Sequence, residues 1–98
     1  MAAAEADAAD AVAYYDAQQP GLGAEFVDEL EVALSRIMNH PQAWARFTAN
    51  SRRCLMERFP YGVLNQVCPD RVIVGAIMHL HRDPLQWQAR ATSSFGEA

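Results

Sequence analysis

The N-terminal part of the chain follows the period of α-helices. Small apolar residues recur at steps of three and four between residues 3 and 18, which places them on one face of a helix. The pattern stops at Pro20, which cannot continue a helix, and the glycines that follow permit a tight reversal. A second apolar stripe lies within residues 24–39 and consists of Phe26, Leu30, Ala33, Leu34 and Ile37. Two helices with a short connection predict an antiparallel hairpin over about residues 3–39.

From about residue 52 the pattern changes to that of β-strands. We predict three strands, at residues 53–59, 63–68 and 71–80, separated by turns at Pro60-Tyr61 and Pro69-Asp70. The third segment is apolar at both parities, which is expected of a strand that is covered on each face. The sequence therefore predicts a three-stranded antiparallel sheet over about residues 52–80.

Two-residue turns at these positions assign the strand residues to two faces. The face that receives the helical hairpin is predicted to hold Cys54, Met56, Val63, Val67, Val72, Val74, Ala76, Met78 and Leu80. The other face is predicted to hold Arg53, Glu57, Gln66, Arg71 and His79 among Leu55, Phe59, Leu64, Ile73 and Ile77. Because Cys54 and Cys68 fall on opposite faces, we expect two reduced thiols and no disulfide between them.

The C-terminal segment, residues 81–98, begins with polar residues and Pro84, which ends the last strand. Pro84 suits the start of a helical turn that carries Trp87 back onto the body of the protein. The small, polar tail over residues 92–98 is expected to be frayed. Together the patterns predict an α+β fold, with a helical hairpin on a sheet, in a single domain over residues 1–98.

Composition limits the class of protein. A chain of 98 residues with 51% hydrophobic and 20% charged residues is a globular domain rather than a disordered segment. Its longest nearly apolar run is about half of a bilayer span, and its alanine-rich start lacks a basic region, so we expect a cytoplasmic protein without membrane contact. Histidines at positions 40, 79 and 81 have no metal-binding spacing, and we expect neither metal nor cofactor.

Charge is distributed unevenly along the chain. Residues 1–31 hold eight acids and no base, whereas residues 32–98 hold four acids and all eight bases. Every base is arginine, whose planar, permanently charged group suits binding of carboxylates or phosphates better than proton transfer. A solvated acidic hairpin beside a basic sheet explains this distribution, and so does a basic surface that faces an acidic partner.

Three stretches in this order resemble the RelE/ParE toxin superfamily of bacterial toxin–antitoxin modules. They are residues 13–26 (AYYDAQQPGLGAEF), residues 58–64 (RFPYGVL) and residues 74–87 (VGAIMHLHRDPLQW). The resemblance implies a type II toxin that is held inactive in a hetero-oligomer by a cognate antitoxin. It also implies that DNA is contacted only through the antitoxin. Freed toxins of the RelE branch cut messenger RNA on the ribosome, and those of the ParE branch poison DNA gyrase.

Individual positions favour the ParE branch. The ribonuclease branch has lysines on the first hairpin strand, an arginine after the aromatic residue that opens the next strand, a late arginine and a late tyrosine. Here the lysines are missing, Gly62 follows Tyr61, and Trp87 lies near the place of the tyrosine, so only Arg82 matches. The alternatives are a ribosome-dependent endoribonuclease and a non-toxic module that only binds its antitoxin.

The resemblance also assigns candidate residues. Contacts to the antitoxin or target are predicted for Arg53, Arg58, Arg71, Arg82 and Trp87. If the chain is a ribonuclease, the catalytic residues are Arg82 and His79. Solvated arginines, a structural histidine and a tryptophan that covers the sheet are the plainer alternatives.

The start of the chain departs from the family. Members generally begin with a β-strand ahead of the first helix, but here the helical pattern begins by residue 3 or 4. We therefore expect an open sheet edge, completed by an antitoxin segment or by a second copy of the chain.

Overall fold

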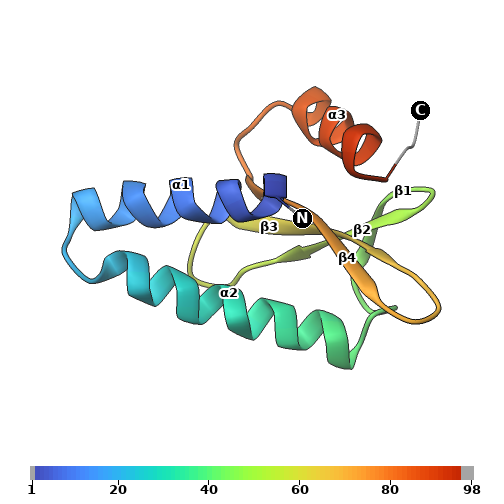
Figure 1. The fold of residues 1–98 in the computed structure, drawn as a ribbon, viewed down its shortest axis with the longest axis horizontal. Helices are drawn as coiled ribbons and strands as arrows, with labels where there is room; N and C mark the ends of the chain where they lie inside the picture. The colour runs from blue at the N-terminus through green and yellow to red at the C-terminus, as the bar shows by residue number, and fades with distance from the viewer. Residues whose placement is uncertain (1, 96–98) are drawn as a thin grey trace.

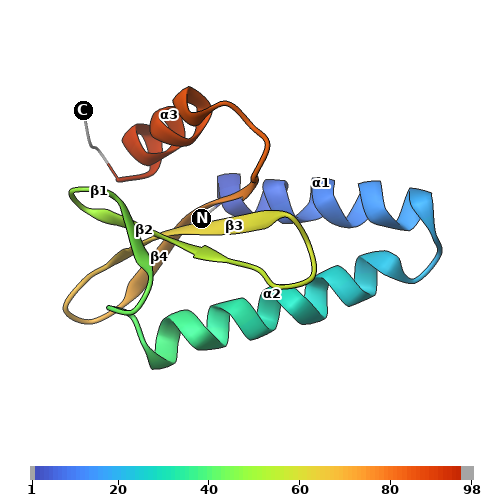
Figure 2. The same cartoon turned by 180° about the vertical axis from the view of Figure 1, so that it is seen from behind.

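The computed structural model describes residues 2–95, which form an α+β domain (Figure 1). Two helices come first, α1 (Ala2–Gln18) and α2 (Leu22–Asn39). Four strands follow, β1 (Ala45–Thr48), β2 (Ser51–Leu55), β3 (Tyr61–Val67) and β4 (Val72–His79), and then helix α3 (Pro84–Phe95). The sheet is antiparallel with the order β1-β2-β3-β4. The α1–α2 hairpin packs on one face of the sheet and α3 packs on the other (Figures 1 and 2).

The predicted helical hairpin is confirmed, and its turn explains why glycines stand there. Gly21 has a φ of 90°, a left-handed conformation that residues with a side chain adopt at a cost. The Gly23 N–H donates to the Asp16 carboxylate at 2.8 Å, so an acid of α1 caps the start of α2. A Cβ on Gly23 would lie 2.8 Å from the Val12 carbonyl oxygen, which shows how closely the two helices approach.

The hairpin and the sheet enclose the larger of two cores. The α2 stripe supplies Phe26, Leu30, Ala33 and Ile37, all buried. An aromatic cluster joins the helices to the β2–β3 connection and β3: it consists of Tyr15, Phe26, Phe59 and Tyr61, with ring centroids 4.8–6.1 Å apart. Such contacts add to the apolar burial that stabilises the layer.

The second core lies between the sheet and α3. Its buried members are Leu64, Ala76, Met78, Trp87 and Ala91, and Phe47 and Phe95 pack against them. The helix is longer than the predicted single turn. Asp83 accepts from the Leu85 N–H at 2.7 Å and so caps its start, and Pro84 occupies its first position. The predicted frayed tail is wrong for residues 92–95, which belong to α3; residues 96–98 lie outside the described part of the chain.

The prediction of three strands is wrong, because β1 (Ala45–Thr48) adds a fourth. This strand is only four residues long, which is too short to show the alternation of apolar and polar residues that marks a longer strand. Two of its residues are exposed. Its aromatic neighbours hold it in place: Trp44 packs against the hairpin core and Phe47 packs against the α3 core. Helix α1 begins at Ala2, the first residue that the structure describes, so the described chain starts with a helix rather than with a strand.

The predicted faces hold for β2, β3 and the first half of β4, and they are wrong for its second half. The predicted turn at Pro60-Tyr61 is wrong, because Leu55 pairs with Gly62, and Phe59 in the longer connection lies in the hairpin core rather than on the other face. The pairs Val67↔Val72 and Asn65↔Val74 agree with the predicted Pro69-Asp70 turn, but the next pair is Leu64↔Ala76. Gly75 is therefore an extra residue, a β-bulge that reverses which side chains face each layer. Consequently Ile77 lies in the hairpin core, whereas Ala76 and Met78 lie under α3. His79, whose ring lies 5.1 Å from Tyr61, changes face with Ile77.

Within residues 2–95 no strand pairs with the outer side of β4, which agrees with the expected open edge, but side chains occupy the centre of this edge. Asp7 of α1 accepts from the Ile77 N–H at 2.9 Å. The Gly75 carbonyl accepts from Arg90 at 3.1 Å and from the Ser94 hydroxyl at 3.0 Å. Arg90 also forms two hydrogen bonds with the Asp7 carboxylate, at 2.7 and 3.0 Å. The two ends of the described chain thus meet across β4 and satisfy edge groups that another strand would otherwise take.

Candidate functional site

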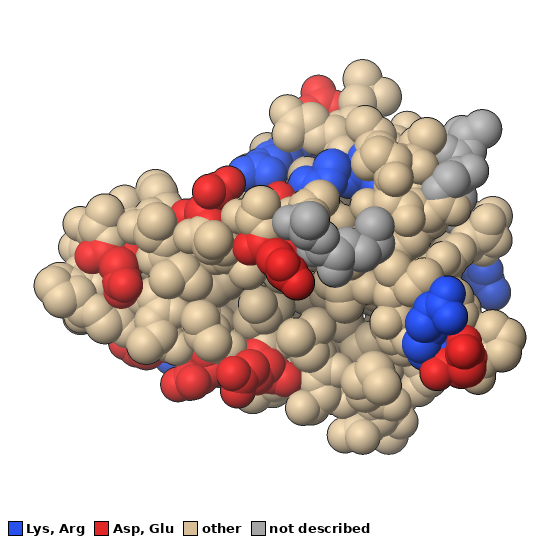
Figure 3. Space-filling model, viewed as in Figure 1, with Lys and Arg blue, Asp and Glu red and all other residues tan. Residues whose placement is uncertain are grey.

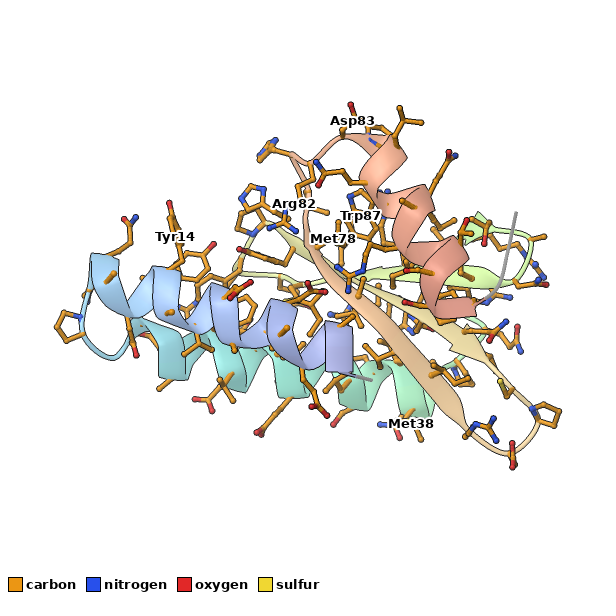
Figure 4. All side chains as sticks on the ribbon, turned by 45° about the horizontal axis from the view of Figure 1, so that its top comes forward. Tyr14, Met38, Met78, Arg82, Asp83 and Trp87 are labelled. Atoms are coloured by element: carbon orange, nitrogen blue, oxygen red, sulfur yellow. The ribbon has the colours of Figure 1, made fainter. Side chains whose placement is uncertain are left out.

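The predicted site residue Arg82 lies at an open hollow formed by α3, the end of β4 and the loop between them. The hollow has a volume of about 390 Å³ and is lined by Met78, Arg82, Gln86, Ala89, Arg90 and Ser93. Figure 4 shows Arg82, Met78 and Trp87 below the start of α3, with Tyr14 on the neighbouring helix. In Figure 3 basic side chains gather in this hollow, and acidic side chains lie along the two N-terminal helices.

Arg82 and Arg90 differ in how their charges are satisfied. Arg90 pairs with Asp7, and the two side chains are only 22% and 13% exposed. Arg82 is exposed, its guanidinium donates to the Met78 sulfur at 3.9 Å, and no carboxylate within residues 2–95 forms an ion pair with it. A free guanidinium beside an apolar floor suits a partner residue that presents a carboxylate next to an apolar group.

Two histidines and a tyrosine adjoin Arg82. The His79 ring lies 5.1 Å from the rings of both Tyr61 and His81. The His81 backbone N–H donates to His79 Nδ1 at 3.2 Å, which requires an unprotonated Nδ1. Burial lowers the pKa of His79 below its ordinary value, and the positive charges of His81 and Arg82 lower it further. Burial raises the pKa of Tyr61. His79 is therefore neutral near pH 7 and able to accept a proton.

This depressed pKa predicts a pH dependence of stability. Because the folded state favours the neutral His79 ring, its contribution is complete above the ordinary histidine pKa of about 6.5 and is lost as the pH falls through the folded-state value. We expect the Tm to fall as the pH drops below about 6.5, and His79→Gln to make this fall shallower. The control is His40→Gln, at the exposed end of α2. Equal slopes for wild type and His79→Gln in thermal melts would contradict the prediction.

Arg53 and Trp87 lie on the α3 side of the sheet but are engaged within the protein. The Trp87 side chain is buried, with 2% exposure. The Arg53 guanidinium lies over the Trp87 ring at 5.4 Å and over the Phe47 ring at 6.0 Å. Trp87 therefore covers the sheet in this structure, the plainer alternative that the sequence left open, and its contact with a partner stays a prediction.

The remaining predicted arginines lie apart from the hollow. Arg58, on the β2–β3 connection, pairs with Glu25 of α2 at 2.8 Å. Arg71, after the β3–β4 turn, lies 3.5 Å from Asp70. Both pairs are largely exposed, and exposed pairs contribute little stability. The structure brings Arg82 and His79 together and does not gather the predicted arginines into one surface.

Two residues at this site, Asp7 and Arg90, are not predicted by the sequence patterns. They are 83 positions apart, and neither belongs to a motif. The sequence signal is an acid next to the alanine stripe of the first helix, and such an acid does not indicate which basic residue will pair with it. The roles of Tyr61 and His81 beside His79 were missed for the same reason, because the contacts depend on how β3, β4 and the loop after β4 meet.

Comparisons with protein-family models, with curated proteins and with solved structures give no match to this chain. None of the helices in residues 2–95 has the length and apolar character needed to cross a membrane. Within the same residues no group of three or more His, Cys, Asp or Glu side chains is placed to hold a metal ion. Both cysteines are free, as expected, with Cys54 buried and Cys68 partly exposed.

Proposed function

We propose that this chain is the toxin of a type II toxin–antitoxin pair, related to the RelE/ParE superfamily and closer to its ParE branch. It is neutralised by a cognate antitoxin, and it acts by binding another protein, DNA gyrase, rather than by cutting RNA. The support is the resemblance of residues 13–26, 58–64 and 74–87, together with the order of a helical hairpin, an antiparallel sheet and a C-terminal helix.

The packing of Trp87 on Gly62 is the observation that favours a non-catalytic toxin. In the ribonuclease branch an arginine occupies the position of Gly62. Here a Cβ on Gly62 would lie 2.9 Å from the Trp87 ring and 3.1 Å from the Arg53 side chain. A larger residue at this position does not fit while α3 is in place, so Gly62 supplies no cation to stabilise a phosphorane, and the neighbouring Arg53 guanidinium is stacked on Trp87.

Arg82 and the hollow beside it support a protein partner. Its guanidinium is exposed and lacks a carboxylate within the described chain, and Met78 and Ala89 give the hollow apolar walls. Arginines at the centre of apolar patches are common anchors of protein interfaces. An antitoxin or target segment that carries an acid beside an apolar residue matches this combination.

A second candidate is the ribonuclease, and one cluster favours it. The neutral His79 ring is a proton acceptor, and Arg82 supplies a cation near it. His79 and Arg82 are the catalytic pair predicted if the chain is a ribonuclease, although the strand lysines and the late tyrosine of that branch are absent.

A growth assay tests the proposal. Inducing the chain alone in bacteria is expected to arrest growth, and co-expression of the cognate antitoxin is expected to restore it. Arg82→Ala is expected to relieve the arrest because it removes the free cation of the hollow, whereas Arg71→Ala, at the distant turn, is expected to remain toxic. Unimpaired growth with the wild-type chain, at matched expression, would instead favour the non-toxic module.

Two further assays separate the targets. Gyrase-dependent cleavage of supercoiled plasmid is expected with the wild-type chain, and His79→Gln is expected to retain it. Primer extension on translated messenger RNA is expected to show no new ends. New ends that disappear in His79→Gln would favour the ribonuclease and contradict the proposal.

A further inference from the structure

Two arginines of the β1–β2 hairpin face each other with no opposite charge between them. Arg46 and Arg52 are directly paired across the two strands, so both side chains project from the same face. Like charges at directly opposed positions destabilise a sheet. Residues 41–56 contain three arginines and no acid, and neither Arg46 nor Arg52 forms an ion pair with a carboxylate of residues 2–95.

These two side chains line a polar pocket of about 210 Å³ beside the β1–β2 turn. Its other lining residues are Gln42, Ala49, Asn50, Ser51, Gln66 and Val67. The lining contains amide groups and two guanidinium groups and no carboxylate. The β1–β2 turn, whose residues line the pocket, lies at the same end of the sheet as the β3–β4 turn and away from the α1–α2 turn (Figure 1).

Neutral acceptors hold both guanidinium groups at the pocket. Arg52 donates to the Trp44 carbonyl at 2.8 Å and to Gln42 Oε1 at 2.7 Å, and Arg46 donates to the Ala49 carbonyl at 3.0 Å. These bonds fix the positions of the two groups without neutralising them, and each guanidinium keeps further N–H donors. The third arginine, Arg53, belongs to the other face and stacks on Trp87.

We propose that this pocket binds a phosphate monoester. Such a group carries about −1.5 to −2 charges at pH 7, which matches two arginines, whereas one carboxylate or one phosphodiester leaves a positive charge uncompensated. Its oxygens accept from two guanidinium forks at once. The pocket has several times the volume of one water molecule, about 30 Å³, and so accommodates a phosphate. The source is either a free mononucleotide or the 5′-phosphate end of a nucleic-acid strand.

Titration of the full-length protein, followed by the backbone amide signals of Ala49, Asn50 and Ser51, tests the proposal. The probes are 5′-AMP, adenosine, a glutamate-rich peptide, and a short oligonucleotide with or without a 5′-phosphate, all at constant ionic strength. We expect saturable shifts with 5′-AMP and none with adenosine. Arg46→Gln and Arg52→Gln are expected to weaken 5′-AMP binding by about tenfold, the loss of one charge-assisted contact. The control Arg71→Gln removes the same charge from the other turn and is expected to change affinity by less than about twofold.

Arg46→Gln keeps the test valid if Arg52→Gln disturbs β1, because Arg46 bonds only to a carbonyl of its own turn. Tighter binding of the 5′-phosphorylated strand than of 5′-AMP identifies a nucleic-acid end, and equal binding identifies a free mononucleotide; both support the site. Equal shifts with adenosine, an Arg71→Gln loss as large as that of Arg46→Gln, or tighter binding of a glutamate-rich peptide would each overturn it.

Discussion

Replacing Asp7 with alanine is expected to lower the free energy of unfolding by about 2–4 kcal/mol. Asp7 accepts two hydrogen bonds from Arg90 and one from the Ile77 N–H, and its side chain is only 13% exposed. Its loss leaves the partly buried Arg90 charge and the Ile77 N–H without their partner. The free-energy cost of these unpaired groups is larger than the net stabilisation that the intact pair contributes. Urea denaturation followed by circular dichroism measures the change.

Asp10→Ala is the matched control, since Asp10 is an exposed acid on the same helix. It is expected to change stability by less than about 0.5 kcal/mol. In a double-mutant cycle with Arg90→Ala, the double variant is expected to lose less than the two single variants combined, by about 1–3 kcal/mol. Equal stabilities of Asp7→Ala and Asp10→Ala would show that the contact across β4 does not stabilise the fold.

The second large effect is expected from Trp87→Ala, at about 3–5 kcal/mol of destabilisation. Trp87 is 2% exposed, forms the centre of the α3 core, and carries the stacked Arg53 guanidinium. Against a total stability of roughly 5–15 kcal/mol for a small domain, this loss releases α3 or unfolds the chain. Denaturation curves and hydrogen exchange of α3 measure it.

Leu85→Ala is the control for this variant, because Leu85 belongs to the same helix and is 70% exposed. A change of less than about 0.5 kcal/mol is expected there. The destabilisation caused by Trp87→Phe is expected to lie between those of Leu85→Ala and Trp87→Ala, since phenylalanine keeps an aromatic ring over the sheet. If the Trp87→Ala protein were stable and α3 kept its protection from hydrogen exchange, Trp87 would be free to act as an interface residue.

Local signals in the sequence were sufficient for much of the fold. The helical stripe through Phe26 and Ile37, the break at Pro20 and the turn at Pro69-Asp70 each depend on a few adjacent residues, and all of them agree with the structure. The missed β1 is too short to show a period. The bulge at Gly75 was missed because a single glycine in an apolar strand is compatible with regular pairing, and the close approach of Ser94 and Phe95 that excludes a side chain there is a tertiary contact.

The candidate site was less predictable than the fold. Arg82 and His79 were found because they stand in one short motif after the last strand. The Asp7–Arg90 pair joins elements at opposite ends of the chain, and the Arg46–Arg52 pair depends on a strand that the pattern did not reveal. In each case the chemistry depends on tertiary contacts rather than on spacing along the sequence.

The bulge at Gly75 has a consequence for insertions and deletions. The two halves of β4 alternate in opposite phase, so that one strand serves both helical layers. Removing this single residue would leave the pairs Asn65↔Val74 and Leu64↔Ala76 in place, so the later side chains would keep their present layers, whereas a side chain at this position would crowd both Ser94 and Phe95. Among homologous chains, loss of this residue should therefore be tolerated better than its replacement by a residue that carries a side chain.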